Sequence, residues 1–303
     1  MTRFRQENGQ SAVLAIVFLT VLLGMAAVVI DVGSWYQAHR AAQATADAAA
    51  LAAAQVLPED PDNAAALAAT YATSNGGGLA TTAVTKGVLP NDTVTVTVER
   101  EAPGFFARLF DIDSVEVDAR AAARSANPSA AQYVAPVVVN HLHPDLLNFK
   151  HPTQINLDFL HKPGSSDGAG SFGLINLRGS GDSGSVGSAD LAKWMAEGFD
   201  GVMEPGIYRA APSTMFNSSH FRDAMEVRTG DDVLFPVYRS LLKGGSTAEY
   251  DIIGWVGFHI TEWSGTGSSG VVRGWFTRYI AKGISSTSAG TPNFGVRTIS
   301  LVE

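Results

Sequence analysis

Histidine is the residue type in this sequence whose spacing comes closest to a metal site. Four of the seven histidines and two aspartates lie within a short stretch: His141, His143, Asp145, His151, Asp158 and His161. Residues two apart on a strand point to the same face, so His141 and His143 could bind one metal ion. These four histidines are candidate metal ligands. However, no H-E-x-x-H motif is present, and we favour a polar loop with incidental histidines. No metal or cofactor is expected.

Two other motifs resemble a catalytic site and a cofactor-binding loop, but the sequence around each does not fit the fold that the motif requires. Gly181-Asp182-Ser183-Gly184 resembles the nucleophile motif of trypsin-like serine proteases, but the preceding chain is too short for the first barrel of that fold and the motif lies in a Gly/Ser run. Gly168 to Gly173 matches G-x-G-x-x-G, yet a predicted strand follows it where a dinucleotide loop requires a helix. We therefore assign no catalytic residue and expect no enzyme.

Aromatic residues recur late in the sequence, at Trp255, Phe258, Trp263, Trp275, Phe276 and Tyr279. Outward-facing aromatic side chains would indicate a surface that binds glycans or proteins. The alternative, which we favour, is a sheet that uses them in its core.

Composition excludes several classes of protein. The 303 residues carry a net charge of −8 without a basic block, whereas nucleic-acid binding requires clustered Lys and Arg. The absence of cysteine excludes disulfides, thiol catalysis and thiolate metal sites. A chain of this length that is 46% hydrophobic can build two folded domains.

The longest apolar run indicates the cellular context of the chain. Ala12 to Ile30 is 19 residues without a charge, and as a helix it would cover about 28 Å, close to a bilayer core. Arg3 and Arg5 precede it, which predicts a cytoplasmic segment 1–11, a transmembrane helix 12–30 and an extracytoplasmic remainder. A cleaved signal peptide and a buried soluble helix are the alternatives.

The helical pattern continues beyond the apolar run. Residues 41–54 contain ten alanines in fourteen positions, so one helix should extend to about Leu57, where Pro58 and Pro61 would stop it. A polar stripe of Arg40, Gln43 and Asp47 lies on one face. Small residues permit close helix approach, and the candidate packing face is Ala42, Ala46, Ala49 and Ala53. It could pack on its own domain or on a partner protein.

The N-terminal segment resembles the TadE/TadG-like proteins of tight-adherence (Flp) pilus assembly. The residues that carry the resemblance are a basic start, then NGQSAVLAIVFLTVLLGMAAVVIDVG and SWYQAHRAAQATADAAALAAA. TadE-type pseudopilins have a Glu shortly after the cleavage-site Gly, and counting from Gly9 that place is Leu14. The resemblance therefore implies a TadG-like, retained membrane helix whose partners are other pilus-assembly or pseudopilin subunits.

The remaining patterns predict two folded regions. In 31–125, alternating residues 93–98 and 114–123 predict strands, with Val94, Val96 and Val98 inward. The intervening APGFFARLFDID should bring Phe105, Phe106, Leu109 and Phe110 to a core. Residues 126–132 are expected to be a linker. In 133–303 we expect six strands, at 134–140, 154–159, 171–177, 233–238, 252–261 and 271–280, and helices after Ser188 and from Ser219.

These patterns together predict an α+β fold: a long transmembrane, pilin-like helix with a small antiparallel sheet, followed by a β-rich extracytoplasmic domain. The expected function is a non-enzymatic, single-pass, membrane-anchored component of Flp pilus assembly or a related secretion machine. Its partners would be the lipid bilayer and pilus-assembly subunits, with no nucleic acid. The alternatives are an anchored glycan- or protein-binding module and an anchored hydrolase that uses the histidine cluster or Ser183.

Overall fold

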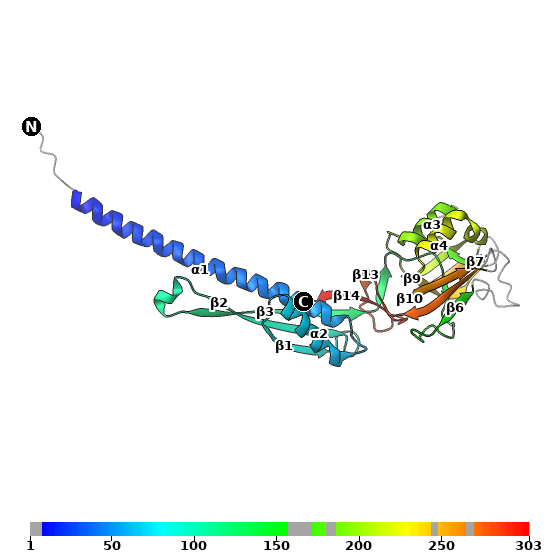
Figure 1. The fold of residues 1–303 in the computed structure, drawn as a ribbon, viewed down its shortest axis with the longest axis horizontal. Coiled ribbons are helices and arrows are strands. Elements are labelled where there is room, and N and C mark those ends of the chain that lie inside the picture. The colour runs from blue at the N-terminus through cyan, green and yellow to red at the C-terminus, as the bar shows by residue number, and fades with distance from the viewer. Residues whose placement is uncertain (1–7, 157–170, 180–185, 244–247, 265–269, 303) are drawn as a thin grey trace, which may run out of the picture. The chain divides into compact units, whose positions relative to one another are not determined.

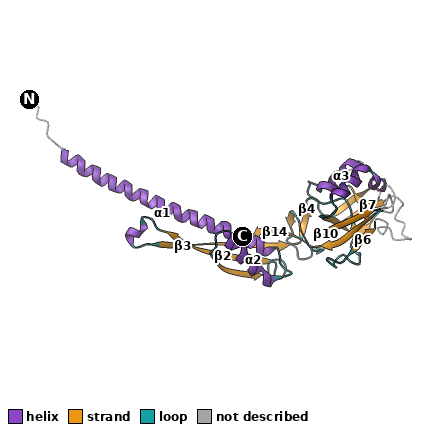
Figure 2. Cartoon of the chain, in the orientation of Figure 1, coloured by secondary structure: helices purple, strands orange, loops and turns teal. Residues whose placement is uncertain are grey.

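A computed structural model describes residues 8–156, 171–179, 186–243, 248–264 and 270–302. The chain divides into two compact units, residues 1–124 with 301–303, and residues 125–300. The fold is α+β, as predicted. Figures 1 and 2 show the elements of each unit.

The first unit is built on one long helix. Helix α1 runs without a break from Asn8 to Ala54, 47 residues, so the predicted continuity through the apolar and alanine-rich stretches is confirmed. Figure 1 shows that only its C-terminal half lies along the rest of this unit. The unbroken alanine run explains why the helix does not stop where the apolar run ends, because alanine has the highest helix propensity.

A second helix follows that the sequence patterns did not predict. Helix α2 spans Pro61–Ser74, with Pro61 in its first turn and Asp60 as N-cap. The Asp60 carboxylate accepts a hydrogen bond from the backbone N–H of Asn63 at 3.4 Å. We expected Pro61 to end a helix. It begins one instead, because proline has no N–H and the first helical turn needs none.

Three antiparallel strands complete the first unit: β1 (Leu79–Thr85), β2 (Thr93–Pro103) and β3 (Ser114–Ala126). The β2–β3 hairpin is in register over its full length, from Thr93 opposite Arg124 to Pro103 opposite Ser114. Val94, Val96 and Val98 are fully buried, so the predicted alternation is confirmed. At Gly78, before β1, a Cβ atom would lie 2.4 Å from the carbonyl oxygen of Glu99, so only glycine fits.

The hairpin ends in a short 3₁₀ turn, η1 (Ala107–Phe110), visible at the far end of β2 and β3 in Figure 2. The prediction that this segment contributes to a core is wrong. Phe105, Phe106, Leu109 and Phe110 are 60%, 41%, 81% and 79% exposed. These four residues lie in the turn of the hairpin, beyond the last β2–β3 pair of Pro103 and Ser114, so the buried face of the hairpin does not reach them.

The second unit contains a seven-stranded sheet. Its central path runs in the order β5-β9-β10-β11-β6, and β8 pairs with β10 and with β7. The bounds of these strands are β5 Val139–Asn140, β6 Thr153–Asn156, β7 Ser171–Ile175, β8 Gly206–Pro212, β9 Asp232–Leu241, β10 Glu249–Ser264 and β11 Val271–Thr277. All six predicted strand regions contain a strand, although the first is reduced to two residues. Strand β8 was missed.

Two helices, α3 (Ser188–Glu197) and α4 (Ser219–Val227), pack together beside this sheet. Both were predicted. The Ser218 hydroxyl caps α4 by accepting the N–H of Phe221 at 3.2 Å, while α3 starts after Gly187 without a side-chain cap. A 3₁₀ turn, η2 (Ser213–Asn217), precedes α4. The shared core is aromatic and includes Trp255, Phe235 and Phe258.

Four short strands remain: β4 Pro128–Ala131, β12 Tyr279–Ile280, β13 Gly283–Ser285 and β14 Val296–Val302, of which the last two residues of β14 belong to the first unit. Strand β4 pairs with β13, and β12 runs parallel to β14. The structure therefore differs from the expected linker at 126–132, because Pro128, Ala130 and Ala131 are buried in a paired strand. The alternation of small residues there was too short to indicate a strand.

Candidate membrane-anchoring site

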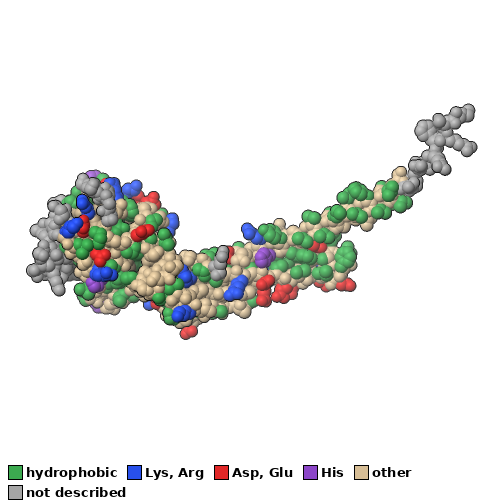
Figure 3. All heavy atoms as spheres, turned by 180° about the vertical axis from the view of Figure 1, so that it is seen from behind, with side chains coloured by type: hydrophobic (Ala, Val, Ile, Leu, Met, Phe, Trp, Pro, Cys, Tyr) green, Lys and Arg blue, Asp and Glu red, His purple; other side chains and the backbone are tan. Residues whose placement is uncertain are grey.

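The N-terminal half of α1 is apolar on all sides and touches almost nothing. Its large side chains from Val13 to Ile30 are between 46% and 70% exposed. The helix is long and apolar enough to cross a membrane, and none of its most apolar 18-residue window is buried. Figure 3 shows hydrophobic side chains along the visible face of this half. A core helix of a soluble protein would bury one face, so the exposure favours a helix whose solvent is lipid.

This exposed half ends at a buried carboxylate. Asp31, the first charged residue after the apolar run, is 4% exposed. Its oxygens accept three backbone N–H groups, from Phe105 at 2.7 Å, Phe106 at 3.1 Å and Ala107 at 2.6 Å. These donors are the free N–H groups at the start of η1, and a carboxylate at such a position is well matched to them. The end of the apolar run is therefore tied to the hairpin.

The alanine-rich half of α1 is used inside its own unit. The four predicted packing residues, Ala42, Ala46, Ala49 and Ala53, are all 0% exposed. Helix α1 packs against α2 and β2, and α2 presents small residues of its own, Ala64, Ala68 and Ala72, all buried. Small side chains on both helices allow their backbones to approach closely. This alanine face is therefore covered within the unit and is closed to a partner helix.

The polar stripe on α1 faces strand β3. The Gln43 amide nitrogen donates to the Asp47 carboxylate at 2.8 Å and to the carbonyl oxygen of Arg120 at 3.2 Å. A ring nitrogen of His39 lies 2.8 Å from the carbonyl oxygen of Asp118. Both carbonyl groups belong to the edge of β3 beside the helix. Gln43 and the neighbouring His39 thus contact strand-edge carbonyl groups that would otherwise be available to another chain.

A partly buried hydrogen-bond network joins the two helices of the first unit to β2. The Arg100 guanidinium donates to the Thr45 hydroxyl at 2.6 Å and to the carbonyl oxygen of Asn75 at 3.0 Å. The Thr45 hydroxyl also donates to the same Asn75 carbonyl at 2.6 Å. Asn75 caps the end of α2. These hydrogen bonds therefore fix the position of α2 on α1, because hydrogen bonds are directional and the packing of alanine side chains is not.

The loop between β1 and β2 is organised by Asp92, which is fully buried. Its carboxylate accepts the N–H groups of Gly87, Val88 and Leu89 at 2.6, 2.9 and 2.7 Å, and the Thr93 hydroxyl at 2.9 Å. Burial by itself raises the pKa of Asp92, but these hydrogen bonds outweigh it and hold the pKa below its usual value. The Asp92 carboxylate thus organises the loop that joins β1 to β2.

The candidate metal ligands do not assemble into a site among the described residues. His143 Nδ1 lies 3.2 Å from the backbone N of Asp145, and its ring packs edge-on against Phe276. His151 Nδ1 is 3.6 Å from Asp145 Oδ1, and Asp145 also accepts the Thr153 hydroxyl at 2.6 Å. His141 contributes its backbone N–H to Tyr238. Across the described ranges, no group of three or more His, Cys, Asp or Glu could hold a metal ion.

Four further features fall outside the described residues: Asp158, His161, the Ser183 motif and the first half of the G-x-G-x-x-G match. The late aromatic residues, in contrast, all lie within the described residues. Trp255, Phe258 and Phe276 are at most 2% exposed. Trp263, Trp275 and Tyr279 are half-buried. Trp275 stacks on His259 with ring centroids 4.3 Å apart. These residues mainly build the core of the sheet, which was the favoured interpretation.

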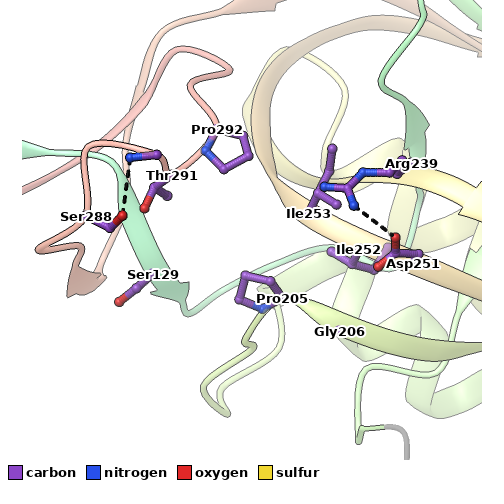
Figure 4. Close-up of a pocket in the computed structure, with 11 residues that line it drawn as sticks. Ser129, Pro205, Gly206, Arg239, Asp251, Ile252, Ile253, Ser288, Thr291 and Pro292 are labelled. Atoms are coloured by element: carbon purple, nitrogen blue, oxygen red, sulfur yellow. Dashed lines mark hydrogen bonds and ion pairs between the residues drawn. The ribbon is translucent and has the colours of Figure 1, made fainter.

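The second unit has an open cavity of about 520 Å³, shown in Figure 4. One wall carries Arg239 and Asp251, whose charged groups are 3.8 Å apart. The facing wall carries Ser288, Thr291 and Pro292. The cavity is lined by one ion pair and by small polar and apolar groups, and its described lining lacks the histidine base that an activated serine requires.

Comparison with known proteins gives a match that lies in the first unit. A search of the curated proteins and a search of the solved structures gave no match. A family model described as putative Flp pilus-assembly TadE/G-like matches residues 9–56. The matched segment covers helix α1 from its second residue, with both of its halves, and the two residues that follow. The N-terminal helix of this chain is therefore similar to the TadE/G-like segment of Flp pilus-assembly proteins.

Proposed function

We propose that the protein is a non-enzymatic, single-pass, membrane-anchored component of Flp pilus assembly or of a related secretion machine. The observation that carries this proposal is the two-part helix α1, which coincides with the TadE/G-like segment. Its first half is exposed and apolar, and its second half is the core of a folded unit. Such a helix holds a folded domain at a membrane surface and needs no chemistry of its own.

The orientation follows from charge. Arg3 and Arg5 precede the apolar run, and Asp31 follows it. Basic residues are retained on the cytoplasmic side. The first eleven residues would therefore be cytoplasmic, residues 12–30 would span the membrane, and both folded units would lie on the far side.

Contact with other pilus-assembly subunits would use the exposed half of α1. Thr20 and Gly24 lie four residues apart on one face, and a Cβ atom at Gly24 would meet nothing within 4 Å. Small residues at this spacing let another transmembrane helix approach closely. The alanine face cannot serve this purpose because α2 and β2 cover it.

A helix replacement tests the proposal. In the source organism, the gene would be deleted and complemented with the full chain or with a version whose residues 12–30 form a leucine-alanine span of equal length. Pilus formation and secretion would be scored. We expect loss on deletion, recovery with the full chain, and membrane insertion without recovery for the replaced span. Unchanged pili and secretion on deletion would refute the proposed function. Recovery by the replaced span would refute docking through the α1 helix and would leave the proposed function standing.

A further inference from the structure

The tip of the β2–β3 hairpin, residues 104–112, exposes five large apolar side chains in a short segment. They are Phe105, Phe106, Leu109, Phe110 and Ile112, with exposed fractions of 60%, 41%, 81%, 79% and 44%. Single exposed apolar residues are common on protein surfaces, but a contiguous group of this kind marks a surface that is covered in use.

The tip has a defined structure rather than a loose one. The N–H of Gly104 donates to the carbonyl of Asp113 at 2.9 Å, and the N–H of Ile112 donates to the carbonyl of Ala107 at 3.2 Å. A Cβ atom at Gly104 would lie 2.6 Å from the carbonyl oxygen of Ile112. Asp111 ends the turn with a left-handed backbone, φ 60°. The apolar side chains are therefore presented outward by an ordered turn.

The position of the tip along α1 identifies what covers it. The Asp31 carboxylate holds the N–H groups of Phe105, Phe106 and Ala107, and η1 contacts α1 directly. Asp31 immediately follows Ile30, the last residue of the apolar run. Figure 1 shows the far end of the hairpin beside the middle of the helix. The tip is thus fixed at the level where about 28 Å of apolar helix ends, which is one bilayer core.

We propose that the hairpin tip is a second membrane contact, which places its apolar side chains at the boundary between the headgroups and acyl chains of the leaflet next to Asp31. The proposal rests on the proposed anchoring by α1. Arg108, exposed between these side chains, reaches the phosphate level while its stem remains in the apolar layer. Two contacts, a spanning helix and a hairpin tip bound to it, restrict the rotation of the first unit about α1.

The charges on the hairpin favour a zwitterionic lipid surface over an anionic one. Glu101, Asp111, Asp113 and Glu116 are exposed on or next to the tip, and Arg108 is the one basic residue in 101–116. The contact is therefore driven by apolar burial and needs no anionic lipid. An alternative occupant, the apolar surface of another protein, is an outcome of the following test.

Fluorescence quenching in vesicles tests the proposal, because the chain has no cysteine and a single introduced cysteine gives a unique label. Full-length Leu109→Cys, carrying an environment-sensitive fluorophore, would be reconstituted into phosphatidylcholine vesicles. Matched labels at Leu22→Cys, within the apolar run, and Tyr71→Cys, on α2, set the two limits. Nitroxide lipids would carry the quencher near the headgroup or deep in the acyl chain.

We expect a blue-shifted Leu109 label, quenched more by the shallow nitroxide than by the deep one. The Leu22 label should show the reverse order, and the Tyr71 label should be unquenched. A Leu109 label that behaves like Tyr71 while Leu22 is quenched would overturn the tip contact and leave the anchor intact. A blue shift without lipid quenching would assign the tip to a protein surface. An unquenched Leu22 label would refute the anchor and the tip contact together.

Asp31→Asn provides a second variant, because it keeps the size of the side chain and removes one acceptor oxygen and the charge. In this background we expect the shallow quenching of the Leu109 label to fall while the quenching of the Leu22 label is unchanged. Unchanged quenching of both labels would show that Asp31 does not set the depth of the tip.

Discussion

The two halves of helix α1 share one continuous backbone and face different surroundings. From Ala12 to Ile30 the side chains are mostly large, aliphatic and exposed on every face, whereas from Asp31 to Ala54 they are mostly small and one face is fully buried. In lipid, large apolar side chains need no partner. In a protein interior, alanines allow α2 to approach closely. The difference shows that the size of the side chains can suit the two halves of one continuous helix to different surroundings.

The largest expected difference is in membrane retention, when the same charge is introduced into each half of α1. Leu22→Arg puts a cation at the middle of the apolar run, which costs about 2.5–3.5 kcal/mol for insertion. Ala44→Arg puts it at an exposed position of the second half and should be tolerated. Carbonate extraction of membranes measures the retained fraction. Equal retention of both variants would mean that the first half does not lie in lipid.

The Asp92 loop offers a test of the folded unit that is independent of the membrane. Asp92→Asn keeps the shape and weakens hydrogen bonds to a charged acceptor, which we expect to destabilise the unit by about 1.5–3 kcal/mol at pH 7. The folded pKa is lowered, so the stabilisation is present above the unfolded value of about 3.9 and is lost as pH falls through the folded pKa. Thermal unfolding of both proteins in detergent from pH 7 to pH 3 measures the difference. A difference that persists unchanged at pH 3 would contradict the assignment.

Larger side chains should affect stability differently on the buried and the exposed face of the second half of α1. Ala46→Leu overpacks a fully buried position and should cost about 1–3 kcal/mol of stability. Ala44→Leu, two residues earlier and exposed, should leave the unfolding temperature unchanged. Membrane retention should be normal for both. If both variants unfold at the wild-type temperature, α2 does not pack on this face.

The smallest effect is expected at the hairpin tip. Phe110→Ser removes a side chain that is 79% exposed, so stability in detergent should change by no more than about 0.5 kcal/mol. Val98→Ala, a buried position in the same hairpin, should cost clearly more. A large loss of stability for Phe110→Ser would mean that the tip belongs to a protein core, which was the expectation from the sequence.

The pattern of residues predicted α1 because both of its signals, an uninterrupted apolar run and an alanine run, are local. Helix α2 was missed for a reason that is also local, since a proline can end one helix or begin another and Pro61 does the second. In the second unit, alternation indicated the long strands. It could not indicate β8 or β14, where pairing with strands that are distant in sequence decides the structure.

The hairpin tip shows why hydrophobicity alone misplaces residues. Phe105, Phe106, Leu109 and Phe110 predict a core because apolar residues ordinarily avoid water. Only the structure shows that no described residue covers them and that Asp31 holds them beside the end of the apolar run. The contact between Asp31 and the N–H groups 74 to 76 residues later has no signal in the sequence. The histidines were expected to lie in a polar loop, and among the described residues no group of three or more His, Cys, Asp or Glu could hold a metal ion.

The central claim is that α1 is retained and spans the membrane with the folded units outside. One measurement tests it: intact mass of Tyr71→Cys protein extracted from membranes after whole cells are treated with a membrane-impermeant maleimide, with Gln6→Cys as the cytoplasmic control. We predict full-length protein in the membrane fraction, labelled at Tyr71→Cys and unlabelled at Gln6→Cys. A soluble product that lacks about the first 35 residues would contradict the claim by identifying a cleaved signal, and a product beginning near Gln10 would replace the retained anchor with a processed pseudopilin.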